Sequence, residues 1–115
     1  MASISDIIGP IYQELSLACD AKRIMLNLDI DNPNLEISDE SANFLNSFLL
    51  TQIDFAGHRC DEGDTITINT NGANIAVKNS GEALSTAEKS QLQELGYEVY
   101  SRYGYGTSVG YEIVD

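Results

Sequence analysis

The sequence predicts an α+β fold, a two-layer sandwich in which about three helices cover one face of a mixed and largely antiparallel sheet. Apolar residues recur at helical spacing in two long stretches, and elsewhere apolar and polar residues alternate with the period of a strand. An Asn-Gly pair joins two alternating runs, which is the strongest short signal for a hairpin. With 115 residues and no internal repeat or linker, residues 1–115 are expected to form a single domain.

The first third of the chain predicts a helix and a strand. Apolar residues spaced by one, three and four positions predict a helix over residues 5–21, with Pro10 as an alternative start. Residues 24–30 alternate as in a strand with one buried face. A turn over residues 31–34 ends this strand, and residues 35–37 allow a second, short strand.

A long second helix follows. Ser38 or Asp39 can cap it, because both side chains accept hydrogen bonds from the free N–H groups of a first turn. Its apolar positions, which we expect to be the best buried of any helix, are Phe44, Leu45, Phe48, Leu49 and Ile53. The polar residues 58–64 are expected to form a loop after it.

The second half predicts a hairpin, a helix and another hairpin. Asn71-Gly72 closes the first hairpin, and the side chains expected to face the core from it are Ile66, Ile68, Ile75 and Val77. Ser85 or Thr86 caps a helix that runs to about Leu95, with Glu88 in the capping-box position. Residues 97–103 and 107–114 alternate as two further strands.

Composition excludes several classes of function. The 18 Asp and Glu against 6 Lys and Arg give a formal charge of −12, and no Lys or Arg lies between Ile24 and His58, so direct nucleic-acid binding is not expected. Cys19 and Cys60 stand alone, which gives no support for a zinc site and suits a reducing compartment. No apolar run could span a membrane, and we expect a cytoplasmic protein. The acidity also fits a halophilic source.

The motifs resemble the ATP-binding domain of sensor histidine kinases, in the class shared with gyrase and the Hsp90 chaperones. The Asn box of that family, N-L-L-x-N-A-x-x-x-A, aligns with residues 47–56. The hydrophobic frame is kept, but neither asparagine is. In the family the second Asn ligates Mg²⁺, which prefers oxygen ligands in octahedral geometry, and Thr51 offers only a hydroxyl in its place.

The first glycine box of the family, D-x-G-x-G, aligns with residues 79–83. Asn79 replaces the Asp that accepts a hydrogen bond from adenine, Gly81 is kept, and Ala83 replaces the second Gly. The Asn79 carbonyl could still accept that bond, whereas Ala83 adds a Cβ where the backbone approaches the nucleotide. The resemblance therefore implies a vestigial nucleotide pocket at Thr51, Asn79, Gly81 and Ala83, and the plain alternative is a loop between a strand and a helix.

The family places an ATP lid and a second glycine box between residues corresponding to Leu84 and Gly96, where only one helix fits. The closing element V-x-S-x-x-G-x-G-T aligns with residues 99–107, so the lid and the second box are deleted in this alignment. An alternative alignment sets residues 106–114 against the second box itself. We prefer the first, which implies an ATPase-like fold with a reduced lid.

Other chemistry is sparse. His58 is the only histidine, so neither a catalytic triad nor a histidine metal pair is available, and residues 61–64 lack the spacing of a calcium loop. Five of the six tyrosines lie between Tyr97 and Tyr111, which is compatible with sheet packing or with a partner surface.

The resulting hypothesis is a degenerate, non-catalytic domain that acts by protein interaction in two-component signalling or a phosphorelay, without a nucleotide cofactor. A response regulator or a sensor kinase is the implied partner. The residues expected to contact it are Asp54 and Glu82 at the old pocket, and Tyr100 and Tyr105 in the last hairpin. Two alternatives remain, a genuine ATP- and Mg²⁺-binding kinase domain that phosphorylates a histidine, and an acidic interaction or inhibitor protein that uses the same fold.

Overall fold

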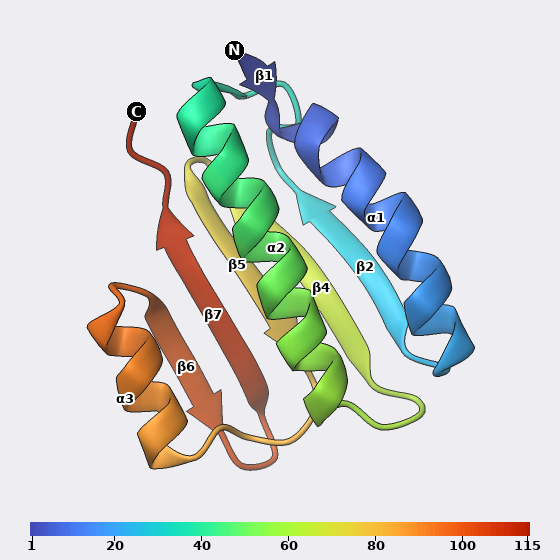
Figure 1. Cartoon of the computed structure of the whole chain (residues 1–115). Helices are drawn as coiled ribbons and strands as arrows, with labels where there is room; N and C mark the ends of the chain where they lie inside the picture. Colours follow the sequence, from blue (N-terminus) through green and yellow to red (C-terminus); the bar gives the residue numbers. More distant parts are fainter.

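A mixed sheet and a layer of helices make up the structure. The computed structural model describes every residue from Met1 to Asp115. The elements in chain order are β1 (Ala2–Ser3), α1 (Ile4–Ala21), β2 (Met25–Ile30), β3 (Glu36–Ile37), α2 (Asp39–Arg59), β4 (Thr65–Asn71), β5 (Asn74–Asn79), α3 (Thr86–Glu94), β6 (Glu98–Arg102) and β7 (Gly106–Glu112). Figure 1 shows α1, α2 and α3 on the same face of the sheet, so the predicted α+β sandwich is confirmed. No helix is both long and apolar enough to cross a membrane.

The main sheet has five strands in the order β2-β4-β5-β7-β6. β2 and β4 are parallel, and the other three pairs are antiparallel. The hairpin predicted at Asn71-Gly72 is confirmed, since Asn71 pairs with Asn74 and Gly72 takes the left-handed φ of 61° that such a turn needs. The last hairpin pairs β6 with β7, as the preferred alignment predicts. Residues 106–112 form a strand of this hairpin, which contradicts the alternative alignment with the second glycine box.

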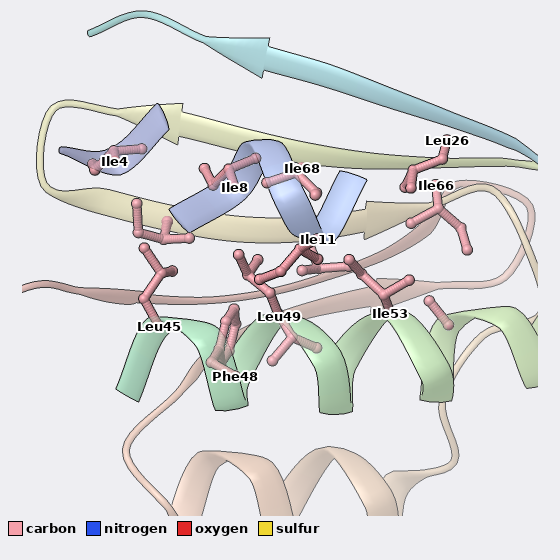
Figure 2. Packing of buried hydrophobic residues seen from close by; sticks show 14 of the residues in the cluster. Ile4, Ile8, Ile11, Leu26, Leu45, Phe48, Leu49, Ile53, Ile66 and Ile68 are labelled. Carbon is pink, nitrogen blue, oxygen red and sulfur yellow. The ribbon is translucent and has the colours of Figure 1, made fainter. Parts of the chain in front are cut away.

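The core lies between the sheet and the first two helices. Figure 2 shows Ile4, Ile8 and Ile11 of α1 and Leu45, Leu49 and Ile53 of α2 pointing at Leu26, Ile66 and Ile68 of the sheet. Ile66, Ile68, Ile75 and Val77 are all buried, as the hairpin pattern predicts. Burying a side chain of this size contributes about 1.5–3 kcal/mol, and the apolar stripe of α2 therefore fixes that helix across β4 and β5.

The alternative that the first helix starts at Pro10 is wrong, because Pro10 lies inside α1. The helix begins after Ser3, whose hydroxyl accepts a hydrogen bond from the Asp6 N–H at 3.2 Å while the Asp6 carboxylate accepts one from the Ser3 N–H at 3.4 Å. Ile4 and Ile8 are completely buried, and their burial stabilises the turns before the proline. Pro10 itself is exposed, so the Asp6 carbonyl that loses a helical partner lies near water.

Two expectations for α2 are wrong. Phe44 does not belong to the buried face but is 49% exposed, because its ring rests edge-on against Tyr111 at the margin of the sheet. His58 is helical rather than part of a loop, since α2 continues to Arg59 after the fully buried Ala56. Leu28 of β2 is likewise 41% exposed, because β2 is an edge strand.

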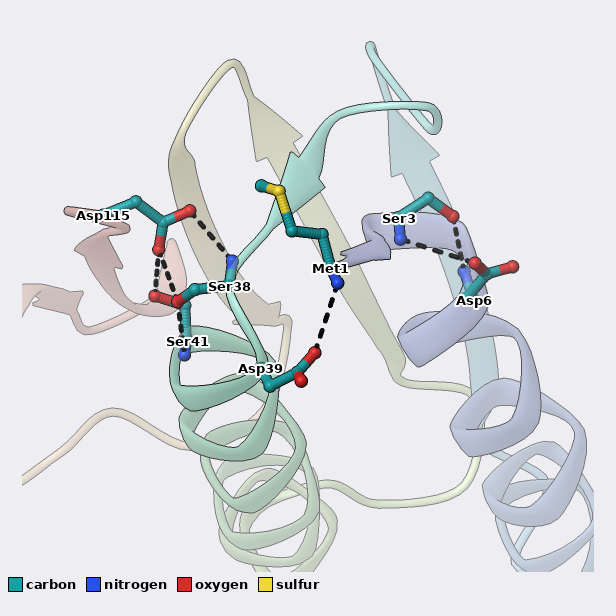
Figure 3. Close-up of polar contacts among 7 residues, drawn as sticks. All are labelled: Met1, Ser3, Asp6, Ser38, Asp39, Ser41 and Asp115. Atoms are coloured by element: carbon teal, nitrogen blue, oxygen red, sulfur yellow. Dashed lines mark hydrogen bonds and ion pairs between the residues drawn. The ribbon is translucent and has the colours of Figure 1, made fainter.

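Both chain ends contact the start of α2. Ser38 caps this helix, and the Asp115 carboxylate accepts hydrogen bonds from the Ser38 N–H at 3.0 Å, from the Ser38 hydroxyl at 2.9 Å and from the Ser41 hydroxyl. The Met1 ammonium lies 3.5 Å from the Asp39 carboxylate (Figure 3). These bonds lower the pKa of Asp115, the Ser41 hydroxyl contributing most. The candidate functional site lies at the other end of α2, near Arg59.

Candidate functional site

The loop over residues 80–85, between β5 and α3, closes onto the end of α2. The Glu82 N–H donates to the Arg59 carbonyl at 2.9 Å, and a Cβ at Gly81 would collide with that same carbonyl. At the other end of the loop, the Leu84 N–H donates to the Ser101 hydroxyl of β6 at 2.8 Å. Only glycine allows the loop to lie this close to the helix, so Gly81, the glycine kept from the first glycine box, has a structural role.

Asn79 sits beneath this loop. It is only 7% exposed, and its Oδ1 accepts a hydrogen bond from the Gly81 N–H at 3.0 Å, which forms a tight turn at the end of β5. Gly106 of β7 crosses so near the Asn79 carbonyl that a Cβ would collide with it. The side-chain oxygen of Asn79 is therefore hydrogen-bonded within the turn, and its second lone pair has no partner in the chain.

A cavity of about 380 Å³ lies between α2 and α3. We call it the α2–α3 cavity; its lining includes Gln52, Phe55, Arg59, Glu88, Leu92 and Leu95. The Arg59 Nε is buried and has no hydrogen-bond partner. Burial lowers the pKa of Arg59, and the charge of Glu88 partly offsets that effect. The lining of the cavity thus combines apolar side chains with the charged residues Arg59 and Glu88.

The predicted pocket residues are only partly brought together. Asn79 lies at the end of β5 beneath the closed loop, which contains Gly81 and the half-buried Ala83. Thr51 is exposed on α2 and does not line the α2–α3 cavity. Asp54 lies elsewhere, in a hollow between α1 and α2, and Glu82 is exposed on the loop. The two carboxylates therefore do not form one acidic rim.

Protein side chains that could ligate a metal are scattered. No group of three or more His, Cys, Asp or Glu side chains lies close enough together to hold a metal ion. His58 donates from Nδ1 to the Asp54 carbonyl at 2.8 Å, which fixes it on the helix surface. Burial raises the pKa of both free thiols, Cys19 and Cys60, and so disfavours their thiolate forms.

The two predicted partner tyrosines do meet. Tyr100 of β6 and Tyr105 of the following turn line a second cavity of about 370 Å³ together with Lys78, Asn79, Thr107 and Ser108. We call it the Tyr100 cleft. It is built on the side of the sheet that carries Lys78, Ser108 and Tyr100, which are register neighbours across β5, β7 and β6.

Sequence reasoning missed three residues of these cavities. Gln52 is buried at a helix position where the Asn box has Ala, and a polar residue four positions after Phe48 was the available signal. The sequence predicted a loop at Arg59, and it gave no reason to single out Lys78 as a site residue. Nothing in the sequence places Lys78 beside Tyr100, because the contact depends on the pairing of both strands with β7.

Comparison with known proteins identifies the fold. No protein-family model matches the chain, and no curated protein does. Among solved structures, the cytoplasmic segment of the histidine kinase QseC matches with a TM-score of 0.77 and 12% identity, over 99% of this chain and 76% of that one. The nucleotide-free catalytic domain of the histidine kinase ThkA matches with a TM-score of 0.79 and 16% identity, over 97% of this chain and 93% of that domain.

A third match is ThkA in complex with the response regulator TrrA, with a TM-score of 0.75 and 17% identity. This chain is covered to 97% there, but it spans only 40% of that protein. At such identities the similarity establishes the fold, which is that of histidine kinase catalytic domains.

Proposed function

We propose that the chain is a non-catalytic, ATPase-like domain of the histidine-kinase type, a pseudokinase that acts by protein interaction in two-component signal transduction. The observation that carries this proposal is the closure of residues 80–85 onto α2. The resemblance requires a lid and a second phosphate-binding box after Leu84, yet Ser85 already caps α3 and α3 leads directly into β6. The chain between β5 and β6 has no segment left to form them.

The altered residues support the same proposal. Thr51 replaces the metal-binding Asn and is exposed, and Asn79 is bonded within its own loop. Each contact to a charged group or metal is worth roughly 1.5–3 kcal/mol. The loss of the metal-binding Asn, of the carboxylate for adenine and of the backbone cradle of the second glycine box therefore removes most of the roughly 8 kcal/mol of a micromolar ligand. The domain works without a nucleotide cofactor.

A titration with ATP and Mg²⁺ tests this part. We expect no Mg²⁺-dependent heat of binding at ATP concentrations below about 1 mM. A micromolar Kd that requires Mg²⁺ would overturn the proposal and favour the genuine kinase domain. The catalytic domain of the histidine kinase ThkA, which has the same fold, serves as the positive control in the same buffer.

A response regulator is the partner we propose, because ThkA, which shares this fold, forms a complex with one. The contact surface is the α2–α3 cavity, where Phe55 and Leu95 expose 48% and 73% of their surface and the charged residues Arg59 and Glu88 complete the lining. Exposed apolar side chains around a polar anchor are typical of protein interfaces.

Purified receiver domains from the organism that encodes the chain are the appropriate probes, with binding measured by biolayer interferometry. Phe55→Glu should weaken binding by roughly tenfold or more, as expected for a central apolar contact. Leu17→Glu also replaces an exposed apolar residue by Glu, at a position on α1 that is 72% exposed, and it should leave the affinity unchanged. Asp54→Lys and Glu82→Lys are measured separately, since the two residues lie on different surfaces. Failure of every receiver domain to bind the wild type would overturn the partner assignment.

A further inference from the structure

The face of the sheet opposite the helices is uncovered. All three helices lie on the other face (Figure 1). Alternation therefore leaves Lys78 of β5, Ser108 of β7 and Tyr100 of β6 side by side on the open face, because Lys78 pairs with Ser108 and Ser108 pairs with Tyr100. No segment of the chain crosses this row.

The end of β6 and the turn after it each add one residue to the row, Arg102 and Tyr105. The Tyr105 N–H donates to the Arg102 carbonyl at 2.9 Å, which folds the turn back toward the sheet. The Arg102 guanidinium then lies 5.4 Å from the centre of the Tyr105 ring, within the range of a cation–π contact. Tyr100 and Tyr105 expose 52% and 75% of their surface, so both rings are available at the mouth of the Tyr100 cleft.

The charge of this cleft is opposite to that of the protein. The chain carries 18 Asp and Glu, yet no carboxylate lines the Tyr100 cleft, whereas Lys78 does. The cavity at the start of α2, the hollow between α1 and α2 and the α2–α3 cavity each include at least one carboxylate, among them Glu112, Asp54 and Glu88. An ammonium group and several hydroxyls without a carboxylate form a site for an anionic acceptor.

We infer that the Tyr100 cleft is a docking site for an acidic segment of a partner protein. Lys78 binds a carboxylate of that segment, the hydroxyls of Tyr100 and Ser108 donate to it, and Arg102 with Tyr105 forms the edge of the site. Tyr and Arg are the residue types enriched at interface hot spots. Nucleic acid does not suit the site, since its repeated phosphates would meet two cations on a chain of net charge −12. This inference stands independently of nucleotide binding and of the α2–α3 cavity.

The test uses the full chain labelled with ¹⁵N and two short peptides with blocked ends, one of alternating Glu and Thr and one of alternating Gln and Thr. Titrations are run at about 0.15 M salt, where the Debye length of roughly 8 Å screens the net charge of the protein. We expect the Glu peptide to shift the amide signals of Lys78, Tyr100, Tyr105 and Ser108 at about millimolar concentration, and the Gln peptide to shift none. Shifts spread over the helices, or no shifts with the Glu peptide, would overturn the inference.

Two charge reversals of equal size complete the test. Lys78→Glu should weaken binding of the Glu peptide by roughly tenfold or more, the loss expected for a charge-assisted hydrogen bond. Lys22→Glu, at an exposed position just after α1, should change the affinity by less than about twofold. Equal weakening by both variants would mean that net charge alone governs the interaction, and would overturn the site. Lys78 is exposed, so Lys78→Glu is expected to fold, and Lys78→Gln provides a second variant that should also weaken binding.

Discussion

The backbone N–H of Glu82 donates a hydrogen bond of 2.9 Å to the backbone carbonyl of Arg59, the last residue of α2. This bond joins the loop after β5 to the end of a helix more than twenty positions earlier in the sequence. It satisfies a carbonyl that the end of the helix would otherwise leave without a partner.

Substitution of Gly81 tests the closed loop. In Gly81→Ala the new Cβ meets the Arg59 carbonyl, a backbone atom that cannot move without displacing α2, so the free energy of unfolding should fall by about 1–3 kcal/mol. Gly57→Ala is the matched control, because Gly57 is helical and nothing lies within 4 Å of its Cβ position. The control should raise stability by about 0.5–1 kcal/mol. Urea unfolding followed by circular dichroism measures both, and equal effects would contradict the contact.

Phe48 should be the most sensitive core position tested. It is 3% exposed, and its ring lies 4.7 Å from that of Tyr111 and 5.4 Å from that of Tyr97. Phe48→Ala should therefore lower the free energy of unfolding by about 3–5 kcal/mol. Phe44→Ala, which removes a ring of the same size from a half-exposed position, should have less than half that effect. Thermal stability unchanged in Phe48→Ala would remove α2 from the core.

Tyr111 offers a stabilising substitution. Its hydroxyl is buried and has no hydrogen-bond partner, and burial raises its pKa well above the ordinary value. Tyr111→Phe removes this unpaired group and keeps the ring contacts with Phe44 and Phe48, so stability should rise by about 1–3 kcal/mol. Tyr97→Phe is the control, and it should be close to neutral. A loss of stability in Tyr111→Phe, measured by urea unfolding, would mean that the hydroxyl does find a partner.

Asp31 should give stability a dependence on acid pH. Its carboxylate accepts hydrogen bonds from the Gly72 N–H at 2.9 Å and from the Thr70 hydroxyl at 3.1 Å, and the bond from Gly72 is the largest cause that lowers its pKa from 3.8. A lowered pKa in the folded state means that the carboxylate stabilises the fold above pH 3.8, and that this contribution disappears as the pH falls through the lowered pKa.

The comparison of Asp31→Asn with the wild type measures this effect. The variant should be less stable at neutral pH, and the difference should shrink toward zero in acid. Asp20→Asn, at an exposed position near the end of α1, is the control for the loss of one negative charge. A difference between Asp31→Asn and the wild type that stays constant from pH 7 to pH 2 would contradict an ionised acceptor at the hairpin.

Sequence reasoning succeeded where a signal is local. Asn71-Gly72 predicts its hairpin because a tight turn needs φ > 0 within a few residues, and Ser85 with Glu88 predicts the start of α3 because both halves of a capping box lie in one turn. The resemblance in residues 47–56 and 79–83 likewise led to the observed fold. Local signals failed at Pro10, because the burial of Ile4 and Ile8 outweighs a proline whose effect is felt at the helix surface.

The sequence by itself therefore determined the class of fold, the hairpins, the helix caps and the identities of the residues that replace a nucleotide site. Only the tertiary structure decided which of these residues meet. Asp54 and Glu82, which the resemblance places at one pocket, lie on different surfaces because α2 turns Asp54 toward α1. Lys78 and Tyr100, far apart in sequence, share a cleft because both pair with Ser108. The physical reason is that strand register and helix rotation are set by burial of the whole core, which no short stretch of sequence specifies.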